Sequence, residues 1–407
     1  MARGRIVPER ERVAVVLAAG KGTRMRSQLP KVLHRAAGRP LLAWVLDAAR
    51  AAGCRRILVV VGHGAEEVRA EIGGDDLTWV VQAEQRGTGH ALAQVADRIA
   101  GPARLLVLSG DVPLVAAQTL ERLLAAAAGW GAMAVAELPA PGGLGRVVAK
   151  MEGAGDSGGS GVGAPGIGTV GRAGVPATGA RSGGGVAGEL LQRIVEAADA
   201  TPAELALPTV NAGLYALPAP EIFTYLAALA PDNAKQELYL TDALTAAAAA
   251  GRRIELVRLD EPWEAQGVND RHELAAVHRR LLDRHLEALM AAGVTVLEPA
   301  RTVVEATARV GVDTVLHAGV SLLGLTSVGA GCVLQQGVWV RDGRIGDRVT
   351  LGPYSVIDGA EVGSGRQVAP FARLAPASPL LSGARVGSAA EDGAAFASPE
   401  GEGGERR

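Results

Sequence analysis

Several absences narrow the classes of protein to which this sequence can belong. Two cysteines in 407 residues exclude a disulfide framework and a cysteine-rich metal site. Aromatic residues make up only 3% of the chain, too few for stacking platforms that bind single-stranded nucleic acid. The 41 basic and 43 acidic residues nearly balance, so no overall field attracts nucleic acid or an anionic membrane. No segment reaches the ~20 apolar residues of a membrane span.

The N-terminus superficially resembles a secretory signal, because four arginines between positions 3 and 12 precede the apolar run 13–20. Lys21 follows that run at once, and no plausible cleavage site is present. We therefore expect a cytoplasmic protein. In a reducing compartment, Cys54 and Cys332 are interpreted as small core residues.

Short apolar runs alternate with amphipathic stretches over the first two-thirds of the chain. Strands are expected at 13–17, 57–61, 79–81 and 105–108, and helices at 40–52, 91–100 and 119–127. This order predicts an α/β domain with a Rossmann-like, mixed but mostly parallel sheet, spanning residues 1–268. Ligands bind such sheets at the carboxyl ends of the strands, so the loops that follow them are candidate sites.

The remaining segments differ in composition. Residues 152–188 are rich in Gly, Ala and Ser and predict a flexible insertion, and residues 388–407 predict a disordered tail. Between 269 and 292, apolar side chains fall on one helical face, which indicates an amphipathic linker helix.

Residues 293–387 carry a different period, with an aliphatic residue about every six positions and glycine after many of them. The pattern predicts a parallel β-helix of hexapeptide repeats, of about four coils. A loose glycine-rich loop region is the alternative. The anchors are Val310, Leu316, Leu322, Val328, Leu334, Val340, Ile345, Leu351, Ile357, Val362, Val368 and Leu374.

The loop after the first expected strand combines glycines and cations. Gly20 and Gly22 permit tight turns whose backbone N–H groups face a phosphate. The dinucleotide fingerprint needs a small residue where Met25 stands, and the Walker A spacing is absent. Four cations nevertheless lie within a dozen positions, namely Lys21, Arg24, Arg26 and Lys31. The pattern predicts a phosphate site, with a solvated basic loop as the alternative.

Longer motifs give this loop a family context. LAAGKGTRM at 17–25, followed by LPKVL at 29–33, resembles the signature of sugar-nucleotide pyrophosphorylases. Further motifs narrow the resemblance to the UDP-N-acetylglucosamine pyrophosphorylases: QAEQRGTGHA at 82–91, GDVPL at 110–114, GR at 145–146, IVE at 194–196, NAG at 211–213, ELYLTD at 237–242 and GVN at 267–269. With the β-helix, the layout resembles bifunctional bacterial enzymes that acetylate glucosamine 1-phosphate and uridylylate the product.

The resemblance implies a reaction of UTP with N-acetylglucosamine 1-phosphate that releases pyrophosphate, with Mg²⁺ as cofactor. It assigns Asp111 and Asn269 as metal ligands, and Arg24 and Lys31 as the catalytic cations that stabilise the α-phosphate. A capping role in a turn is the alternative for Asp111.

The resemblance also assigns the substrate contacts. Uracil and ribose would lie against the backbone of Ala19 and Gly20 and against Gln82, Gly87 and Thr88. The hydroxyl and acetamido groups of the sugar would meet Gly145, Glu196 and Asn211, for which solvated surface positions are the alternative. Leu17, Ala18, Ser109 and Gly110 complete the expected substrate-binding set. His90 is interpreted as a satisfied turn residue.

Some positions depart from the family pattern. Ser109 stands where a tyrosine is usual, and Ala197-Ala198 replaces a pair that ends in lysine, which leaves the sugar phosphate open. A related enzyme for another sugar 1-phosphate, such as glucose 1-phosphate, and a non-catalytic sugar-nucleotide binding module are the alternatives.

The C-terminal part departs further. Ala375 replaces an expected arginine, and the later coils of an acetyltransferase are missing, so we expect no acetyl transfer. The β-helix, left-handed in this family, is expected to form a homotrimer.

Overall fold

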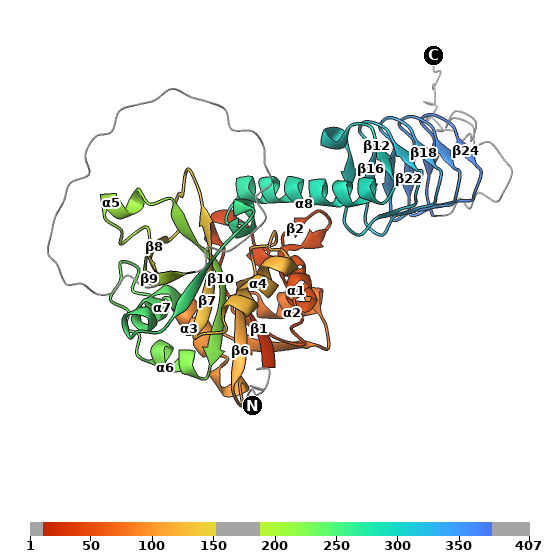
Figure 1. Ribbon diagram of the computed structural model, residues 1–407. Coiled ribbons are helices and arrows are strands. Elements are labelled where there is room, and N and C mark those ends of the chain that lie inside the picture. Colours follow the sequence, from red (N-terminus) through yellow and green to blue (C-terminus); the bar gives the residue numbers. More distant parts are fainter. Residues whose placement is uncertain (1–10, 152–187, 377–407) are drawn as a thin grey trace, which may run out of the picture. The chain divides into compact units, whose positions relative to one another are not determined.

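The computed structural model describes residues 11–151 and 188–376, and the chain divides into two compact units. One unit comprises Met1–His34 and Pro40–Val277, and the other comprises Arg35–Arg39 and His278–Arg407. The division falls inside helix α8 (Arg271–Ala291) (Figure 1). The expected insertion, apart from Gly188, and the expected C-terminal tail lie outside the described residues. The domain boundaries proposed from the sequence stay predictions.

The first unit is built on a nine-stranded sheet with the order β5-β4-β1-β6-β10-β7-β11-β9-β8. Its parallel side contains the four strands expected from the sequence: β1 (Glu11–Ala18), β4 (Arg56–Val61), β5 (Leu77–Val81) and β6 (Ala103–Ser109). Their aliphatic runs are buried on both faces, as parallel strands require. The carboxyl ends of these strands therefore share one edge of the sheet.

The other side of the sheet is largely antiparallel. Strand β10 (Thr209–Ala219) runs antiparallel to β6 and to β7 (Gly131–Glu137), and β8 (Arg146–Met151) runs antiparallel to β9 (Glu189–Val195). Among the described strands of this side, only β11 (Ile254–Arg258) adds a parallel pairing, with β7. The expected parallel arrangement thus holds on one side. Strands β8 and β9 flank the Gly-rich segment, and antiparallel neighbours need no helical crossover between them.

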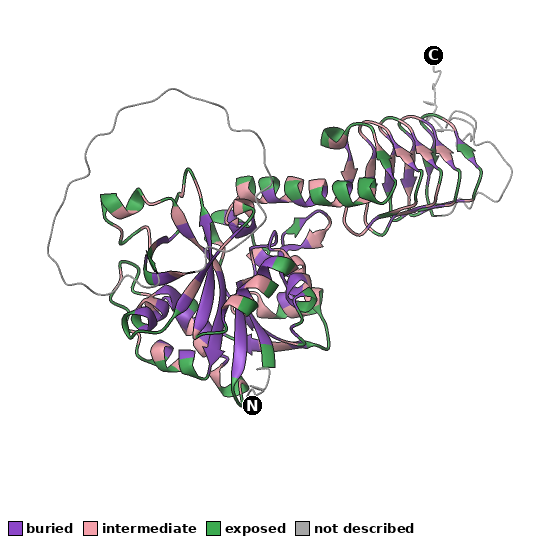
Figure 2. Ribbon diagram, viewed as in Figure 1, coloured by how far each residue is buried: buried purple, intermediate pink, exposed green. Residues whose placement is uncertain are grey.

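Helices cover both faces of this sheet, and buried residues run along its strands (Figure 2). One apolar core includes side chains of α1 (Leu41–Ala51) and α4 (Ala117–Ala126). The opposite core includes α3 (Thr88–Ala93), α6 (Glu221–Ala227) and α7 (Leu240–Ala249). Smaller elements are α2 (Ala65–Ile72), α5 (Pro202–Leu205), β2 (Arg35–Ala36), β3 (Arg39–Pro40) and the short 3₁₀ turns η1 (Thr23–Met25), η2 (Lys31–Leu33), η3 (Ala96–Arg98), η4 (Pro262–Ala265) and η5 (Pro299–Arg301).

The helix expected at 91–100 is wrong in its bounds. Helix α3 begins at Thr88, directly after Gly87, whose φ is 105°. It ends at Ala93, and only the short turn η3 follows. Apolar spacing alone extended the expected helix past its end at Ala93. None of the helices in the described ranges combines the length and hydrophobicity needed to cross a membrane.

The second unit contains three sheets of very short parallel strands. Its anchors from Leu316 to Leu374 are buried and Val310 is partly buried, so the loose-loop alternative is wrong. The strands are β12 (Thr295–Val296), β13 (Val303–Val304), β14 (Arg309–Val310), β15 (Val315–Leu316), β16 (Ser321–Leu323), β17 (Ser327–Val328), β18 (Val333–Leu334), β19 (Trp339–Arg341), β20 (Arg344–Ile345), β21 (Thr350–Leu351), β22 (Val356–Asp358), β23 (Glu361–Val362), β24 (Gln367–Val368) and β25 (Arg373–Leu374).

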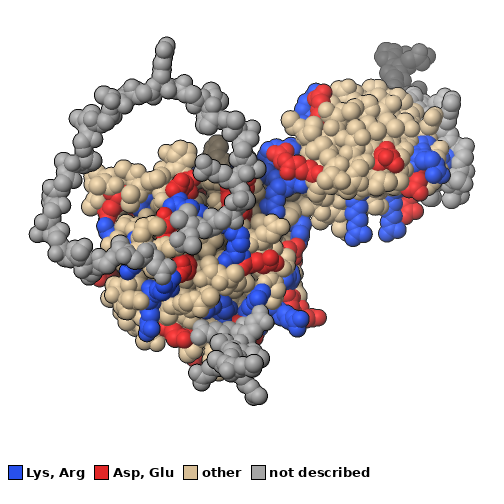
Figure 3. All heavy atoms as spheres, viewed as in Figure 1, with Lys and Arg blue, Asp and Glu red and all other residues tan. Residues whose placement is uncertain are grey.

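The aliphatic anchors of each coil stack on those of the next coil, inside the β-helix. Leu316 pairs with Leu334, and Leu334 with Leu351, in parallel register along one sheet. Charged side chains are sparse on the visible face of this unit (Figure 3), and ion pairs such as Arg341–Asp358 join neighbouring coils. Cys332 and Cys54 are both buried, which confirms their reading as small core residues, and burial raises the pKa of the Cys54 thiol to about 11.

Candidate active site

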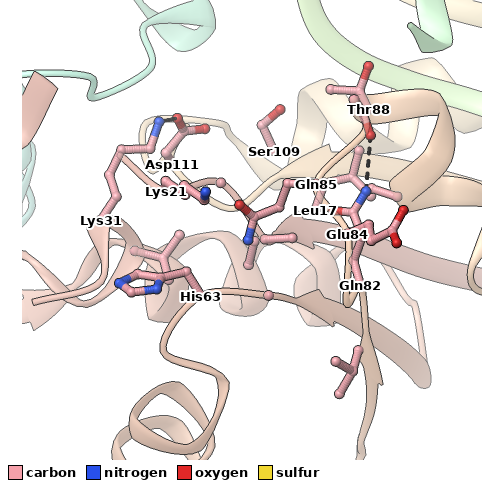
Figure 4. A pocket seen from close by; sticks show the side chains of 18 of the residues that line it. Leu17, Lys21, Lys31, His63, Gln82, Glu84, Gln85, Thr88, Ser109 and Asp111 are labelled. Atoms are coloured by element: carbon pink, nitrogen blue, oxygen red, sulfur yellow. Dashed lines mark hydrogen bonds and ion pairs between the residues drawn. The ribbon is translucent and has the colours of Figure 1, made fainter. Parts of the chain in front are cut away.

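A cavity of about 890 Å³ opens at the carboxyl ends of the parallel strands (Figure 4), within the size range of small-molecule sites. Its walls come from the loops after β1, β4, β5 and β6. The structure brings many of the expected site residues together in this lining: Leu17, Ala18, Ala19, Gly20, Lys31, Gln82, Gly87, Thr88, Ser109 and Asp111. The site therefore lies where ligands bind sheets of this type.

The glycine-rich loop folds closely around Lys31. Gly22 has φ 59°, and a Cβ atom placed on it would lie 2.7 Å from Cβ of Lys31. Across the cavity floor, a Cβ on Gly62 would lie 2.8 Å from the carbonyl oxygen of Ala19. Both glycines permit a backbone approach that a larger residue would block. The loop is thus packed into the wall of the cavity. The alternative of a solvated basic loop describes only its exposed cations.

Lys31 meets both expected metal ligands. It begins η2 directly after Pro30, and its ammonium forms an ion pair with Asp111 Oδ2, toward which it points in Figure 4. The same Nζ donates a hydrogen bond to Asn269 Oδ1 at 3.3 Å. The side chains of Lys31 and Asp111 are only 15% and 18% exposed. Residues 31, 111 and 269, distant in sequence, therefore share one point at the edge of the sheet.

Local structure explains why Asn269 reaches this point. The N–H of Val268 donates to the carbonyl oxygen of Asp111 at 2.9 Å, which ties the two segments together. Asp270 Oδ1 accepts hydrogen bonds from the N–H groups of His272 and Glu273, capping α8. Glu273 in turn accepts from the N–H of Asn269 at 2.5 Å. The start of α8 therefore fixes the backbone of Asn269.

The oxygens of Asp111 and Asn269 have the chemistry that Mg²⁺ prefers, because both are hard donors and they already converge on one cation. Within the described ranges, no point is surrounded by three or more His, Cys, Asp or Glu side chains. A cation held here would therefore take few ligands from the described residues, which suits an ion that also binds phosphate oxygens and water. The residues fit a magnesium ion.

Arg24 is not part of this cluster. It lies in η1, is exposed, and does not line the cavity. Hydrogen bonds from the backbone of Glu273 and His272 lower the pKa of Asp270, and the charge of Arg24 adds to that effect. Arg24 thus lies near Asp270, at the beginning of α8, and its catalytic role stays a prediction. Gly110 is also outside the lining, where its N–H donates to the carbonyl oxygen of Leu17 at 2.9 Å.

Gln82 is the most buried polar group of the cavity wall. Its Nε2 donates to the carbonyl oxygen of Gly87 at 3.2 Å and lies 2.9 Å from His90 Nδ1. The other ring nitrogen of His90 bonds the amide of Gln94 at 3.2 Å. Both ring nitrogens of His90 therefore have hydrogen-bond partners, as expected. The residue lies in helix α3, however, and not in a loop turn. Its ring holds Gln82 in place.

Backbone contacts hold the loop around Gly87 and Thr88. A Cβ on Gly87 would lie 2.5 Å from the carbonyl oxygen of Leu238. Thr88 Oγ1 accepts a hydrogen bond from the N–H of Leu240 at 3.1 Å. The motifs at 82–91 and 237–242 are therefore two sides of one packed structure, and Glu237 from the second motif joins the cavity lining.

Gly145, Glu196 and Asn211 form a second cluster, outside the residues that line the cavity. The N–H of Asn211 donates to the carbonyl oxygen of Gly145 at 2.9 Å, and a Cβ on Gly145 would lie 3.3 Å from Glu196 Oε1. Asn211 Oδ1 accepts from the N–H of Gly213 at 3.0 Å. A Cβ on Gly213 would lie 3.6 Å from Ser109 Oγ, so this cluster borders the cavity at Ser109.

Burial controls the ionisation of the second cluster. Desolvation raises the pKa of Glu196, and the hydroxyl of Thr241, which donates to Glu196 Oε1 at 2.9 Å, opposes that rise. The nearby charge of Lys235 also opposes it. Desolvation similarly raises the pKa of Tyr239 to about 12 and, next to this cluster, that of Asp242. These groups favour their neutral forms more than exposed counterparts do.

Sequence reasoning missed some of the residues that line the cavity. Gly62 and His63 follow β4, and their position at the carboxyl end of a parallel strand was the available signal. Glu84, Gln85 and Glu237 stand inside motifs that were already recognised, but no role had been assigned to them. These three side chains add acidic and amide groups to the cavity wall, where the sequence had predicted mainly glycines and cations.

Comparison with known proteins defines the class first. Residues 14–148 match the family model of the MobA-like NTP transferase domain, a range that includes the parallel side of the sheet and the glycine-rich loop at 17–25. Together with the cavity at the strand ends, the match makes the first unit a nucleotidyltransferase domain. A solved structure of UDP-glucose pyrophosphorylase complexed with UDP-glucose covers 66% of this chain and 97% of its own, at 18% identity and a TM-score of 0.47, too weak a likeness to support an argument.

Curated relatives then define the family. The bifunctional protein GlmU of Trichlorobacter lovleyi is 39% identical over 383 residues, covering 93% of this chain and 75% of its own length. GlmU of Syntrophotalea carbinolica is 40% identical over 358 residues, covering 86% of this chain and 69% of its own length. The chain belongs to the GlmU family, and its similarity extends through both units.

Proposed function

We propose that the chain joins UTP and N-acetyl-α-D-glucosamine 1-phosphate to give UDP-N-acetylglucosamine and pyrophosphate, with Mg²⁺ as cofactor. The observation that carries the proposal is the convergence of Lys31, Asp111 and Asn269 at the cavity lined by the phosphate loop. The relatives are named bifunctional GlmU proteins, and the resemblance of the motifs implies this uridylyl transfer. The product would be a peptidoglycan precursor.

The residues of the cavity suit a reaction between two anions. The sugar phosphate attacks the α-phosphorus in line, so the site must neutralise charge and align the reactants. Residues 19–21 line the cavity, so their backbone N–H groups would be available to the phosphates, and Lys31 would supply a mobile positive charge at the α-phosphate. Arg24 keeps the role at the α-phosphate that the resemblance assigns to it. Bound Mg²⁺, held by Asp111 and Asn269, would supply the remaining charge neutralisation.

The remaining groups select the substrates. Gln82, held by His90 and Gly87, presents an amide that offers a donor and an acceptor to the uracil edge. Gly145, Glu196 and Asn211 are hydrogen-bonded to one another or packed together, and they would orient the acetamido and hydroxyl groups of the sugar. Preordered polar groups of this kind discriminate against substrates that lack the matching partner.

The experiment is a substrate panel. N-acetylglucosamine 1-phosphate, glucose 1-phosphate and other sugar 1-phosphates are combined with UTP, dTTP, CTP and GTP, with Mg²⁺, and pyrophosphate release is measured. We expect the largest kcat/KM for UTP with N-acetylglucosamine 1-phosphate. If pyrophosphate is released only with another sugar phosphate, that compound is the substrate instead of N-acetylglucosamine 1-phosphate. If no pair releases pyrophosphate, a non-catalytic binding module is favoured.

Transfer to another sugar 1-phosphate is the second candidate. Ser109 places a small hydroxyl beside Gly213, where the family has an aromatic side chain, and exposed Ala198 supplies no cation near Glu196. Both changes fall on the sugar side and leave the phosphate loop intact. The same panel separates the two candidates, because glucose 1-phosphate lacks the acetamido group.

We also propose a left-handed β-helix that supports a homotrimer, which light scattering of the whole chain would test. For the 407-residue polypeptide we expect no acetyl transfer to glucosamine 1-phosphate, and release of CoA from acetyl-CoA would contradict that expectation.

A further inference from the structure

The ammonium of Lys31 lies where a divalent cation would be expected. It contacts Asp111 Oδ2 and Asn269 Oδ1 together, and these are the two oxygens that we assign to Mg²⁺. No other described cation contacts both side chains. Lys31 therefore places a positive charge of the protein between these two oxygens.

We propose that Lys31 and the divalent cation exclude one another from Asp111 and Asn269, so that Lys31 turns to the phosphates only when the metal enters. This inference rests on the proposed function, because it needs a metal and a phosphate at this site. Lys31 would then have two successive roles. It neutralises Asp111 in the metal-free protein, and it becomes a phosphate-binding group once that carboxylate is taken.

Electrostatics and geometry both support exclusion. A single carboxylate cannot offset an ammonium and a divalent cation in direct contact, since two positive charges a few ångströms apart repel strongly in a partly buried site. The Lys31 side chain has four methylene groups and lines the cavity next to Gly22, so its ammonium has space to move toward a phosphate. Asn269 stays in place because Glu273 holds its backbone.

Lys21 offers a matched comparison. It lines the same cavity and carries the same charge, but it is exposed, and no hydrogen bond or ion pair joins it to the described residues. If general repulsion alone weakened metal binding, removing Lys21 or Lys31 would have similar effects. If the two cations compete for the same oxygens, only the loss of Lys31 should matter strongly.

The first test is calorimetric titration of the full chain with Mg²⁺ alone, without nucleotide or sugar. We expect Lys31→Met to bind Mg²⁺ about tenfold more tightly than the wild type, and Lys21→Met to differ by less than about threefold. Equal affinities of Lys31→Met and the wild type, or equal gains in both variants, would overturn the proposal. The titration is independent of turnover, so it stands even if the substrate assignment fails.

The second test uses the unsubstituted protein. Brief acylation with an amine-reactive ester, followed by mass spectrometry, reports the access of Lys31 relative to Lys21. We expect Mg²⁺ to increase modification of Lys31 several-fold and to leave Lys21 unchanged. Modification of Lys31 that is equally fast with and without Mg²⁺ would show that the metal does not release it, and would refute the mechanism.

Discussion

Two polar clusters border the cavity, and they are held together in different ways. At the proposed phosphate end, Lys31, Asp111 and Asn269 are joined by an ion pair and a hydrogen bond between side chains. At the proposed sugar end, Asn211 bonds backbone groups of Gly145 and Gly213, and Glu196 accepts from a hydroxyl. The first cluster depends on charge balance, whereas the second depends on hydrogen bonds to the backbone and includes one largely buried carboxylate.

This difference sets what each cluster can do. An ion pair at a cavity wall can be exchanged for another cation or for a phosphate, so the phosphate end suits a step in which charge changes. A network anchored on backbone groups keeps its geometry when a ligand binds, so the sugar end suits selection between similar substrates. We therefore expect substitutions at the first cluster to affect kcat, and those at the second to affect KM for the sugar phosphate.

The largest expected effect follows from Asp111→Ala, which removes the carboxylate shared by Lys31 and the proposed metal. Turnover should fall about 10³-fold, because charge neutralisation at the reacting phosphate is lost. Pyrophosphate release at saturating substrates measures the effect. Asp75→Ala, at an exposed loop position, is the matched control and should leave kcat within about twofold. Unchanged turnover of Asp111→Ala would remove the metal assignment.

Glu196→Gln should raise KM for the sugar phosphate by about tenfold to thirtyfold and change KM for UTP little. The substitution keeps the shape but replaces a charged acceptor with a neutral amide, and hydrogen bonds to charged groups are worth about 1.5–3 kcal/mol. Steady-state kinetics with each substrate varied in turn gives both constants. Glu67→Gln, on the exposed face of α2, serves as the control. A matching rise in KM for UTP would contradict the division between the two ends.

The pH dependence sharpens the same comparison. Burial raises the pKa of Glu196, so its carboxyl takes up a proton at higher pH than an exposed one. The wild-type kcat/KM for sugar phosphate should therefore decline on the acidic side sooner than that of Glu196→Gln. Asp242, whose pKa burial also raises, is present in both proteins, so the difference between the two profiles isolates Glu196. Superimposable profiles would exclude a role for its ionised form.

Thermal stability should follow the same group with a defined sign. A raised carboxyl pKa in the fold means that its stabilising contribution is complete below the unfolded pKa and is lost as pH rises through the folded value. Glu196→Gln should therefore match the wild-type Tm at acidic pH and exceed it above neutrality. Thermal unfolding across that range measures the difference.

The sequence predicted the parallel strands and the β-helix anchors because each depends on a local period of apolar residues. The strands β1, β4, β5 and β6 and the buried series from Leu316 to Leu374 both follow such a pattern. The antiparallel side of the sheet was harder to predict from the sequence, because pairing partners such as β10 and β6 are far apart in the chain. Periodicity carries no information about that choice.

The candidate site shows the same limit. Motif resemblance identified Lys31, Asp111 and Asn269 individually. It did not predict that the ammonium of Lys31 would contact the side-chain oxygens of both Asp111 and Asn269. The contact depends on the hydrogen bond between Val268 and Asp111 and on the cap of α8, which bring distant segments together. Resemblance also assigned Arg24 a role at the α-phosphate, and that role stays a prediction, because Arg24 is exposed and lies outside the cavity lining.

The smallest expected effect tests whether the sugar end lost a cation that matters. Ala198 is exposed and lies between Glu196 and Asp199, so Ala198→Lys adds a positive charge without disturbing the core. An exposed charge pair contributes about 0.2–1 kcal/mol, so kcat/KM for the sugar phosphate should rise only about twofold to fivefold. Ala197→Lys adds the same charge one residue earlier and should give a smaller gain. If both variants gain equally, the effect is a general attraction of anions, and the specific geometry around residue 198 plays no part.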